Sequence, residues 1–221
     1  MHFSVFDIIL LTVILISLSV YFQKQTPLYL QLYPVYLSSA FVIGLIEEWL
    51  VQHGKYNTGV ANVWGTIEFC FYFFVLHQII FNIKIRRIIL YVTIFYALFA
   101  FFNLFFIKHK VGFNPVNFTV GCLITVLLCI YYFVEIFQKT EAESLSRSPA
   151  FWIASAILFN TVLIFPTFAL ESFLEEQTKV DKASQIFYEN LGTIVTIIIV
   201  LTFILYVIGF LCRIRIKKSS L

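Results

Sequence analysis

Seven long apolar stretches follow one another along the chain, and they constrain its fold more than any other feature. They cover residues 5–22, 29–50, 60–82, 88–107, 115–138, 150–170 and 187–212. An α-helix needs about 20 apolar residues to cross the hydrocarbon core of a bilayer. With 61% hydrophobic and 12% charged residues, the chain has too little polar surface for a soluble domain of its size. The sequence therefore predicts an all-α fold in which residues 1–221 form one transmembrane domain of seven helices in a lipid bilayer.

Basic residues divide unevenly between the two sides of such a bundle. Ten of the 15 lysines and arginines fall in the segments on the side of the C-terminus. Because cytoplasmic loops carry the excess of positive charge, this division predicts a cytoplasmic C-terminus and an N-terminus outside. The basic run from Arg213 to Lys218 directly follows the last apolar stretch, which favours a role in topology or lipid contact over nucleic-acid binding. No basic residue precedes the first stretch and no small-residue cleavage site follows it, so we expect that stretch to remain as a helix.

Polar groups inside the apolar stretches are the strongest pointers to function. A charged side chain near the bilayer centre costs about 2.5–3.5 kcal/mol on insertion scales, so such residues usually face the bundle interior. With the predicted orientation, the outer half of the bundle is rich in carboxylates and amides. The predicted ligand-binding residues are Glu47, Glu68, Asn160, Glu189 and Asn190.

Small residues share helix faces with two of these glutamates. Ala40 and Gly44 precede Glu47 at helical spacing, and Gly65 precedes Glu68 in the same way. Small residues let helices approach closely, which predicts that both carboxylates lie where helices pack rather than where lipid is. The functional interpretation is an outward-facing acidic pocket that holds a proton, a cation or a cationic ligand. The structural interpretation is that these groups satisfy one another and hold the bundle together.

Motifs for catalysis or metal binding are missing from the sequence. It has no HExxH, GxSxG or phosphate-binding glycine loop, and only two aspartates, Asp7 and Asp181. The four cysteines have no ligand spacing with one another or with histidines. We therefore expect neither an enzyme, a cofactor nor a metal site.

Several strings together resemble a family of small bacterial seven-helix membrane proteins that are associated with sensor histidine kinases. These strings are 32–37 (LYPVYL), 68–73 (EFCFYF), 86–90 (RRIIL), 121–135 (GCLITVLLCIYYFVE), 149–153 (PAFWI) and 209–214 (GFLCRI). The resemblance covers nearly the whole chain. It implies a multi-pass protein of the bacterial inner membrane that works with a membrane histidine kinase, and it brings no catalytic residues.

Three functions compete at this point. The first is a sensory or signalling accessory protein that passes a helix rearrangement to a separate kinase. The second is a transporter of a small solute or ion, supported by a weak internal echo: residues 46–48 resemble 174–176 and residues 65–67 resemble 192–194, which would fit two three-helix units joined by a fourth helix. The third is an intramembrane enzyme, for which no nucleophile or metal cluster is visible. A site closed toward the cytoplasm favours the sensor, whereas a polar path to both faces favours the transporter.

Overall fold

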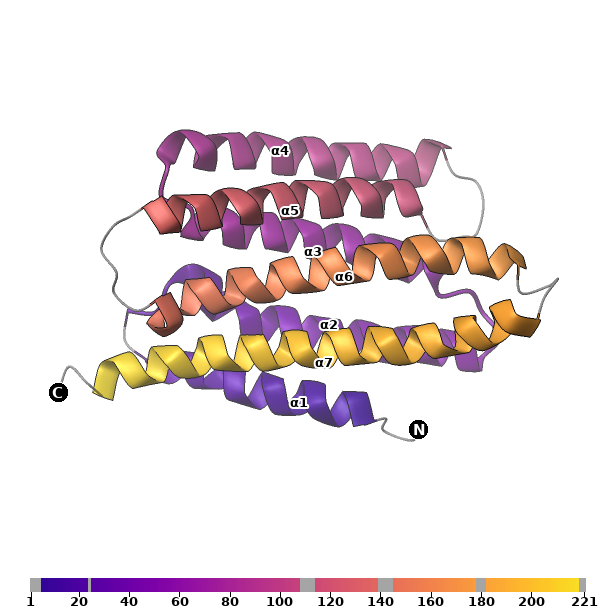
Figure 1. Cartoon of the computed structure of the whole chain (residues 1–221), viewed down its shortest axis with the longest axis horizontal. Coiled ribbons are helices and arrows are strands. Elements are labelled where there is room, and N and C mark those ends of the chain that lie inside the picture. The colour runs from indigo at the N-terminus through magenta and orange to yellow at the C-terminus, as the bar shows by residue number, and fades with distance from the viewer. Residues whose placement is uncertain (1–4, 24, 108–113, 139–144, 178–181, 219–221) are drawn as a thin grey trace.

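The computed structural model describes residues 5–23, 25–107, 114–138, 145–177 and 182–218. Side chains are described for these residues except 5–6, 107, 146, 167–177, 182–191 and 213–218. Within this part of the chain every regular element is a helix (Figure 1). The elements are α1 (Val5–Leu18), η1 (Ser19–Phe22), α2 (Leu28–Gln52), α3 (Thr58–Ile79), α4 (Ile83–Phe102), the π-helical turn η2 (Asn103–Ile107), α5 (Pro115–Gln138), η3 (Leu145–Arg147), α6 (Pro149–Gln177) and α7 (Lys182–Lys218).

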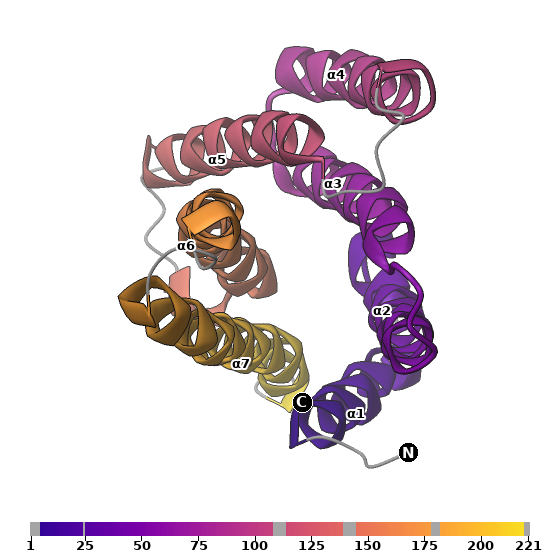
Figure 2. The ribbon, with the colours of Figure 1, turned by 90° about the vertical axis from the view of Figure 1, so that its right-hand side faces the viewer.

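The helices form a ring with one helix outside it. In order around the ring come α1, α2, α3, α5, α6 and α7, and contacts between α7 and α1 close it (Figure 2). Helix α4 packs mainly on the outer side of α3 (Figure 2). The ring therefore consists of two consecutive groups of three helices, and α4 is the connection between them.

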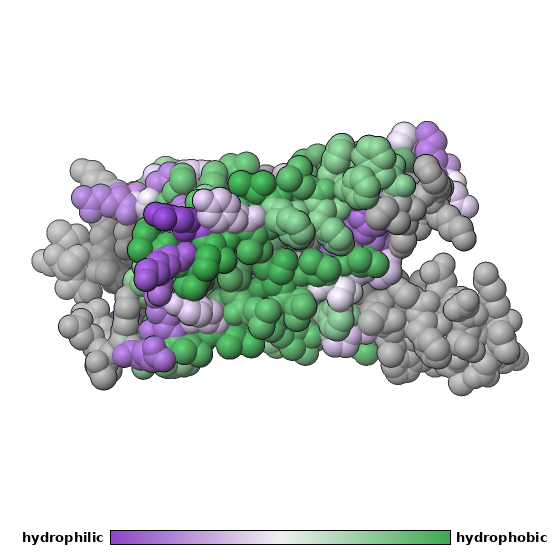
Figure 3. All heavy atoms as spheres, turned by 90° about the horizontal axis from the view of Figure 1, so that it is seen from above, coloured by the Kyte–Doolittle hydropathy of each residue, from purple (hydrophilic) through white to green (hydrophobic). Residues whose placement is uncertain are grey.

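The surface of the bundle suits a bilayer. Among the described residues, six helices are long and apolar enough to cross a membrane. Large apolar side chains point outward, as with Phe95 at 72% and Leu98 at 64% exposure on α4. Figure 3 shows the apolar surface as a continuous middle zone with hydrophilic residues gathered toward the two ends. Exposure of so large an apolar surface to water is unfavourable, so the surface of the bundle suits a lipid environment.

The first predicted span is shorter than the sequence indicated. Residues 5–22 form α1, with 14 residues, followed by the four-residue turn η1. This is fewer than the about 20 helical residues that a span ordinarily needs. By length and composition, six helices can thus cross a membrane, and a seventh span formed by residues 5–22 stays a prediction.

Two predicted boundaries were wrong. The basic residues Arg86 and Arg87 lie in the first turns of α4 and not in a loop, because the side chain of Asn82 caps that helix by accepting a hydrogen bond from the Lys84 amide at 2.9 Å. The predicted stretches 150–170 and 187–212 leave residues 171–186 between two membrane-crossing helices. Most of this segment instead continues α6 to Gln177 and begins α7 at Lys182. Helix propagation past the membrane zone costs little once a helix is nucleated, which explains the longer elements.

Candidate functional site

Glu68 lies near the middle of α3, between Thr58 and Ile79. At 1.5 Å per residue, the carboxylate-bearing residue is about 15 Å from the start of the helix. Helix α3 is about as long as a hydrocarbon core is thick, and Glu68 lies close to the midpoint of its length. A carboxylate at that depth requires partners within the protein.

Two tyrosine hydroxyls donate hydrogen bonds to the same oxygen of Glu68. Tyr72, one turn further along α3, donates to Oε1 at 2.5 Å, and Tyr36 from α2 donates to it at 2.7 Å. The two hydroxyl oxygens are 3.2 Å apart. Hydrogen bonds to an ionised acceptor are roughly twice as strong as those between neutral groups. The carboxylate therefore joins α2 to α3 inside the bundle.

The second oxygen of this carboxylate is left available. Oε2 of Glu68 has no hydrogen-bond partner among the described residues. Protein atoms surround the carboxylate on all sides, yet the side chain of Glu68 and that of Tyr36 both keep a partly exposed surface. The second carboxylate oxygen is thus free to accept a further hydrogen bond.

Aromatic rings fix the position of Tyr36. Its ring stacks on Phe71 with centroids 4.3 Å apart and an interplanar angle of 11°, and on Trp64 at 5.8 Å and 13°. Both partners belong to α3, on either side of Glu68 in the sequence. Stacked aromatic pairs contribute about 0.5–1.5 kcal/mol beyond their buried area. The hydroxyl that reaches Glu68 is thus held by a rigid aromatic support.

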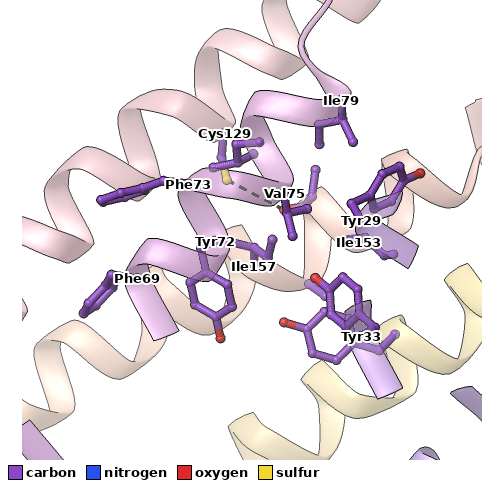
Figure 4. Packing of buried hydrophobic residues seen from close by; sticks show 14 of the residues in the cluster. Tyr29, Tyr33, Phe69, Tyr72, Phe73, Val75, Ile79, Cys129, Ile153 and Ile157 are labelled. Carbon is purple, nitrogen blue, oxygen red and sulfur yellow. Dashed lines mark hydrogen bonds between the residues drawn. The ribbon is translucent and has the colours of Figure 1, made fainter. Parts of the chain in front are cut away.

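Two further tyrosines extend the polar group across the ring. Tyr33 of α2 and Tyr206 of α7 are fully buried, and their ring centroids are 5.2 Å apart. The hydroxyl of Tyr206 interacts electrostatically with Tyr72 and Glu68. In Figure 4 the rings of Tyr33 and Tyr72 lie in one region between the helices. We call Glu68, Tyr33, Tyr36, Tyr72 and Tyr206 the tyrosine–carboxylate site.

Among the described residues, the hydroxyls of Tyr33 and Tyr206 make no hydrogen bond of regular geometry, although the two hydroxyls interact with each other and that of Tyr206 also interacts with Tyr72. An unsatisfied buried hydroxyl costs about 1–3 kcal/mol. Of the two hydroxyls, that of Tyr206 interacts with Glu68, so a polar guest beside the carboxylate could also bind this hydroxyl.

The other predicted site residues lie elsewhere. Glu47 is partly buried near the end of α2 and makes no described contact with Glu68. Asn160 accepts a hydrogen bond from Thr202 at 3.5 Å, which joins α6 to α7. Glu189 and Asn190 lie in α7, and their side chains are outside the described residues. The described contacts bring none of these four side chains to Glu68.

Sequence reasoning missed Tyr33, Tyr36 and Tyr206 because a tyrosine in an apolar stretch is counted as part of the hydrophobic core. One signal for them exists in α2. Tyr29, Tyr33 and Tyr36 recur at i, i+4 and i+7, which places three hydroxyl-bearing rings on one helix face.

Replacing Tyr36 by phenylalanine should lower the free energy of unfolding by about 1–2 kcal/mol. The change removes one hydrogen bond to a charged acceptor and keeps the stacked ring. Denaturant titration of the protein in mixed micelles measures this loss. Tyr91→Phe is the matched control, because the Tyr91 ring is 67% exposed on α4. Equal stabilities of the two variants would show that the Tyr36 hydroxyl contributes nothing.

All four cysteines are free, and the described residues contain no group of three or more histidine, cysteine, aspartate or glutamate side chains that could hold a metal ion. Comparison of the chain with models of protein families, with curated proteins and with solved structures finds no match, so the resemblance to kinase-associated membrane proteins stays a prediction.

Proposed function

We propose that this protein is a sensory or signalling component of the bacterial inner membrane that binds a small cation or cationic ligand at Glu68. The observation that carries the proposal is the mid-membrane carboxylate, held on one oxygen by Tyr36 and Tyr72 and available on the other. A purely structural carboxylate would be expected to use both oxygens, since each unpaired polar atom in lipid costs free energy.

The chemistry around Glu68 favours a cation as the guest. The carboxylate supplies negative charge, and the hydroxyl oxygens of Tyr33 and Tyr206 supply two further acceptors. In our proposal Glu47, Asn160, Glu189 and Asn190 line the outer approach to this site.

The proposed topology has seven spans, with the N-terminus outside and the C-terminus in the cytoplasm. It takes α1 together with η1 as the first span. The two ends of the chain lie at opposite ends of the bundle, as an odd number of crossings requires (Figure 1). Helix α4 begins at the end of the bundle where α7 terminates (Figure 1), and Lys84 and Arg87 are exposed in its first turns, which agrees with an excess of positive charge at the cytoplasmic end.

Helix α7 provides a route from the site to a partner. It has 37 residues, which at 1.5 Å each gives about 55 Å, well beyond the thickness of the hydrocarbon core. Tyr206 places this helix in the tyrosine–carboxylate site, and the same helix continues to Lys218. A guest that draws Tyr206 toward Glu68 would move α7, and a membrane histidine kinase packed against its cytoplasmic end would receive that movement.

Transport is the second candidate, and the ring favours it. The groups α1–α3 and α5–α7 follow each other around the ring with α4 outside, which is the arrangement expected of two parallel three-helix repeats. A transporter would move the same cation that a sensor would only bind. Uptake of the cation into protein-containing vesicles, driven by its gradient, distinguishes the two functions.

Trp64 offers a direct test of binding. Its ring stacks on Tyr36, so a guest at Glu68 should change its fluorescence. The chain has three tryptophans, and phenylalanine at positions 49 and 152 leaves Trp64 as the single reporter. In nanodiscs, sodium, potassium or tetramethylammonium ions are titrated at constant ionic strength. We expect a saturable change for at least one cation that is lost in Glu68→Gln. The same change in Glu68→Gln, or none with any cation, contradicts the proposal.

A further inference from the structure

A second polar cluster lies at the other side of α3, where α3, α4 and α5 meet. Asn103, Asn114 and Asn117 are buried, at 5%, 2% and 4% exposure. Nδ2 of Asn103 donates to Oδ1 of Asn117 at 2.7 Å and, at 3.4 Å, to Oδ1 of Asn114. The backbone amide of Asn114 donates to Oδ1 of Asn62 on α3 at 2.9 Å. We call these four residues the asparagine cluster.

The sequence around the cluster explains its geometry. Asn114 precedes Pro115 and caps α5, accepting a hydrogen bond from the Asn117 amide at 3.3 Å. Asn103 begins the π-helical turn η2, which interrupts the end of α4. Single π-helical turns often occur at functional sites, because they turn one side chain out of the regular helical register. Asn117 completes the link by donating from Nδ2 to the Ala100 carbonyl at 3.2 Å.

One donor of the cluster has no partner. Nδ2 of Asn114 is buried and makes no hydrogen bond with any of the described residues. Beside it lies a cavity of about 20 Å³ lined by Asn62, Thr66, Tyr96, Asn114 and Asn117, together with Gly65 and apolar neighbours. This volume holds one water-sized particle. Side chains that line it are uncharged.

We infer that the asparagine cluster is a binding site for one small hydrogen-bond acceptor, either a water molecule or a halide ion. The unpaired amide of Asn114 supplies the donor, whereas the hydroxyls of Thr66 and Tyr96 already donate to the carbonyls of Asn62 and Asn117. A cation is disfavoured, because the group left unsatisfied is a donor and no carboxylate lines the cavity. The site is independent of Glu68 and would stand if the proposed function failed.

Gly65→Ala tests whether the cavity is occupied. A Cβ at Gly65 meets no atom within 4 Å, so the methyl group enters open space. If the cavity holds an acceptor, a methyl group on Gly65, which lines the cavity, reduces the room for that acceptor beside the Asn114 amide, so the melting temperature in nanodiscs should fall relative to the control. The control is Gly44→Ala, another helical glycine with nothing within 4 Å, on the exposed face of α2. It carries the same gain in helix propensity.

A second variant ties the effect to the proposed donor. Asn114→Ser keeps an oxygen that can cap α5 but removes Nδ2. In this background Gly65→Ala should lose its penalty and behave as Gly44→Ala does. The inference is overturned if, with Asn114 intact, the Gly65→Ala variant is as stable as the Gly44→Ala variant or more stable. That result would mean that the cavity is empty, because filling an empty cavity stabilises a protein.

The nature of the guest follows from two further measurements. If the guest is a halide, replacing gluconate by chloride in the buffer should raise the melting temperature of the wild-type protein. The same replacement should not change the melting temperature of the Asn114→Ser variant. If the guest is water, chloride has no effect, and magnetisation passes from water to the Asn114 side-chain amide in a nuclear Overhauser experiment. Absence of both signals overturns the site.

Discussion

Glu68→Ala should lower the free energy of unfolding by about 2–4 kcal/mol. The change removes the common acceptor of two hydroxyls, Tyr36 and Tyr72, which lie inside an apolar bundle. Each buried donor left without a partner costs about 1–3 kcal/mol. This loss is partly offset, because a charged side chain in the membrane carries a free-energy cost that alanine does not have. Unfolding in mixed micelles, followed by circular dichroism, measures the net loss.

Glu68→Gln separates stability from charge. Its amide oxygen still accepts both tyrosine hydroxyls, so we expect a loss below about 1 kcal/mol. Glu48→Ala is the control for the loss of a carboxylate, because Glu48 only accepts an exposed hydrogen bond from Gln52 at 2.8 Å. A Glu68→Ala protein as stable as Glu48→Ala would mean that the carboxylate does not hold α2 and α3 together.

Gly121→Ala should cost about 1–3 kcal/mol, which is the usual cost of overpacking a core. A Cβ at this position of α5 would lie 2.5 Å from Cδ2 and 2.6 Å from Cγ of Phe69 on α3. The Phe69 ring has little freedom to give way, since it packs edge-on against Phe118, at 5.4 Å, and Tyr96, at 6.1 Å. This glycine lets α3 and α5 approach at the junction between the two groups of three helices.

A glycine series provides the comparison for this loss. At Gly209 a Cβ would meet Cγ1 of Ile153 at 3.2 Å, a contact that a small shift relieves, and at Gly192 it would meet nothing within 4 Å. The destabilisation by alanine should therefore decrease from Gly121 to Gly209 and reach zero or a slight gain at Gly192. Thermal melts of the three variants in one detergent give the order, and a Gly121 variant as stable as the Gly192 variant would contradict the close approach.

The arrangement of the helices could be predicted only in part from the sequence. Long apolar stretches define membrane-crossing helices well, because lipid leaves few alternatives for the backbone. Their ends are set by capping residues such as Asn82 and by elongation beyond the bilayer, as in α7, which hydropathy does not detect. The ring order, with α4 outside, depends on contacts such as that of Gly121 with Phe69, which have no local signature.

The candidate site, too, could be predicted only in part from the sequence. Glu68 could be identified from the sequence because a carboxylate in an apolar helix stands out. Its partner Tyr36 has only the helical spacing of Tyr29, Tyr33 and Tyr36 as a signal, and Tyr206 has none, since a tyrosine in a hydrophobic stretch is counted as part of the core. Asn103 and Asn114 were separated by an apolar run and an unassigned loop, and only the packing of α4 against α3 and α5 brings their side chains together.

The central claim is that Glu68 binds a cation within the helical ring. Its most direct test is modification of the protein in nanodiscs by a hydrophobic carbodiimide, which reacts with carboxyl groups in apolar surroundings, followed by mass spectrometry of the peptides that contain Glu47 and Glu68. We predict that Glu68 is modified and that the cation identified by Trp64 fluorescence protects it in a saturable manner, whereas modification of Glu47 does not change at the same cation concentrations. Modification of Glu68 that is the same with and without that cation would contradict the claim.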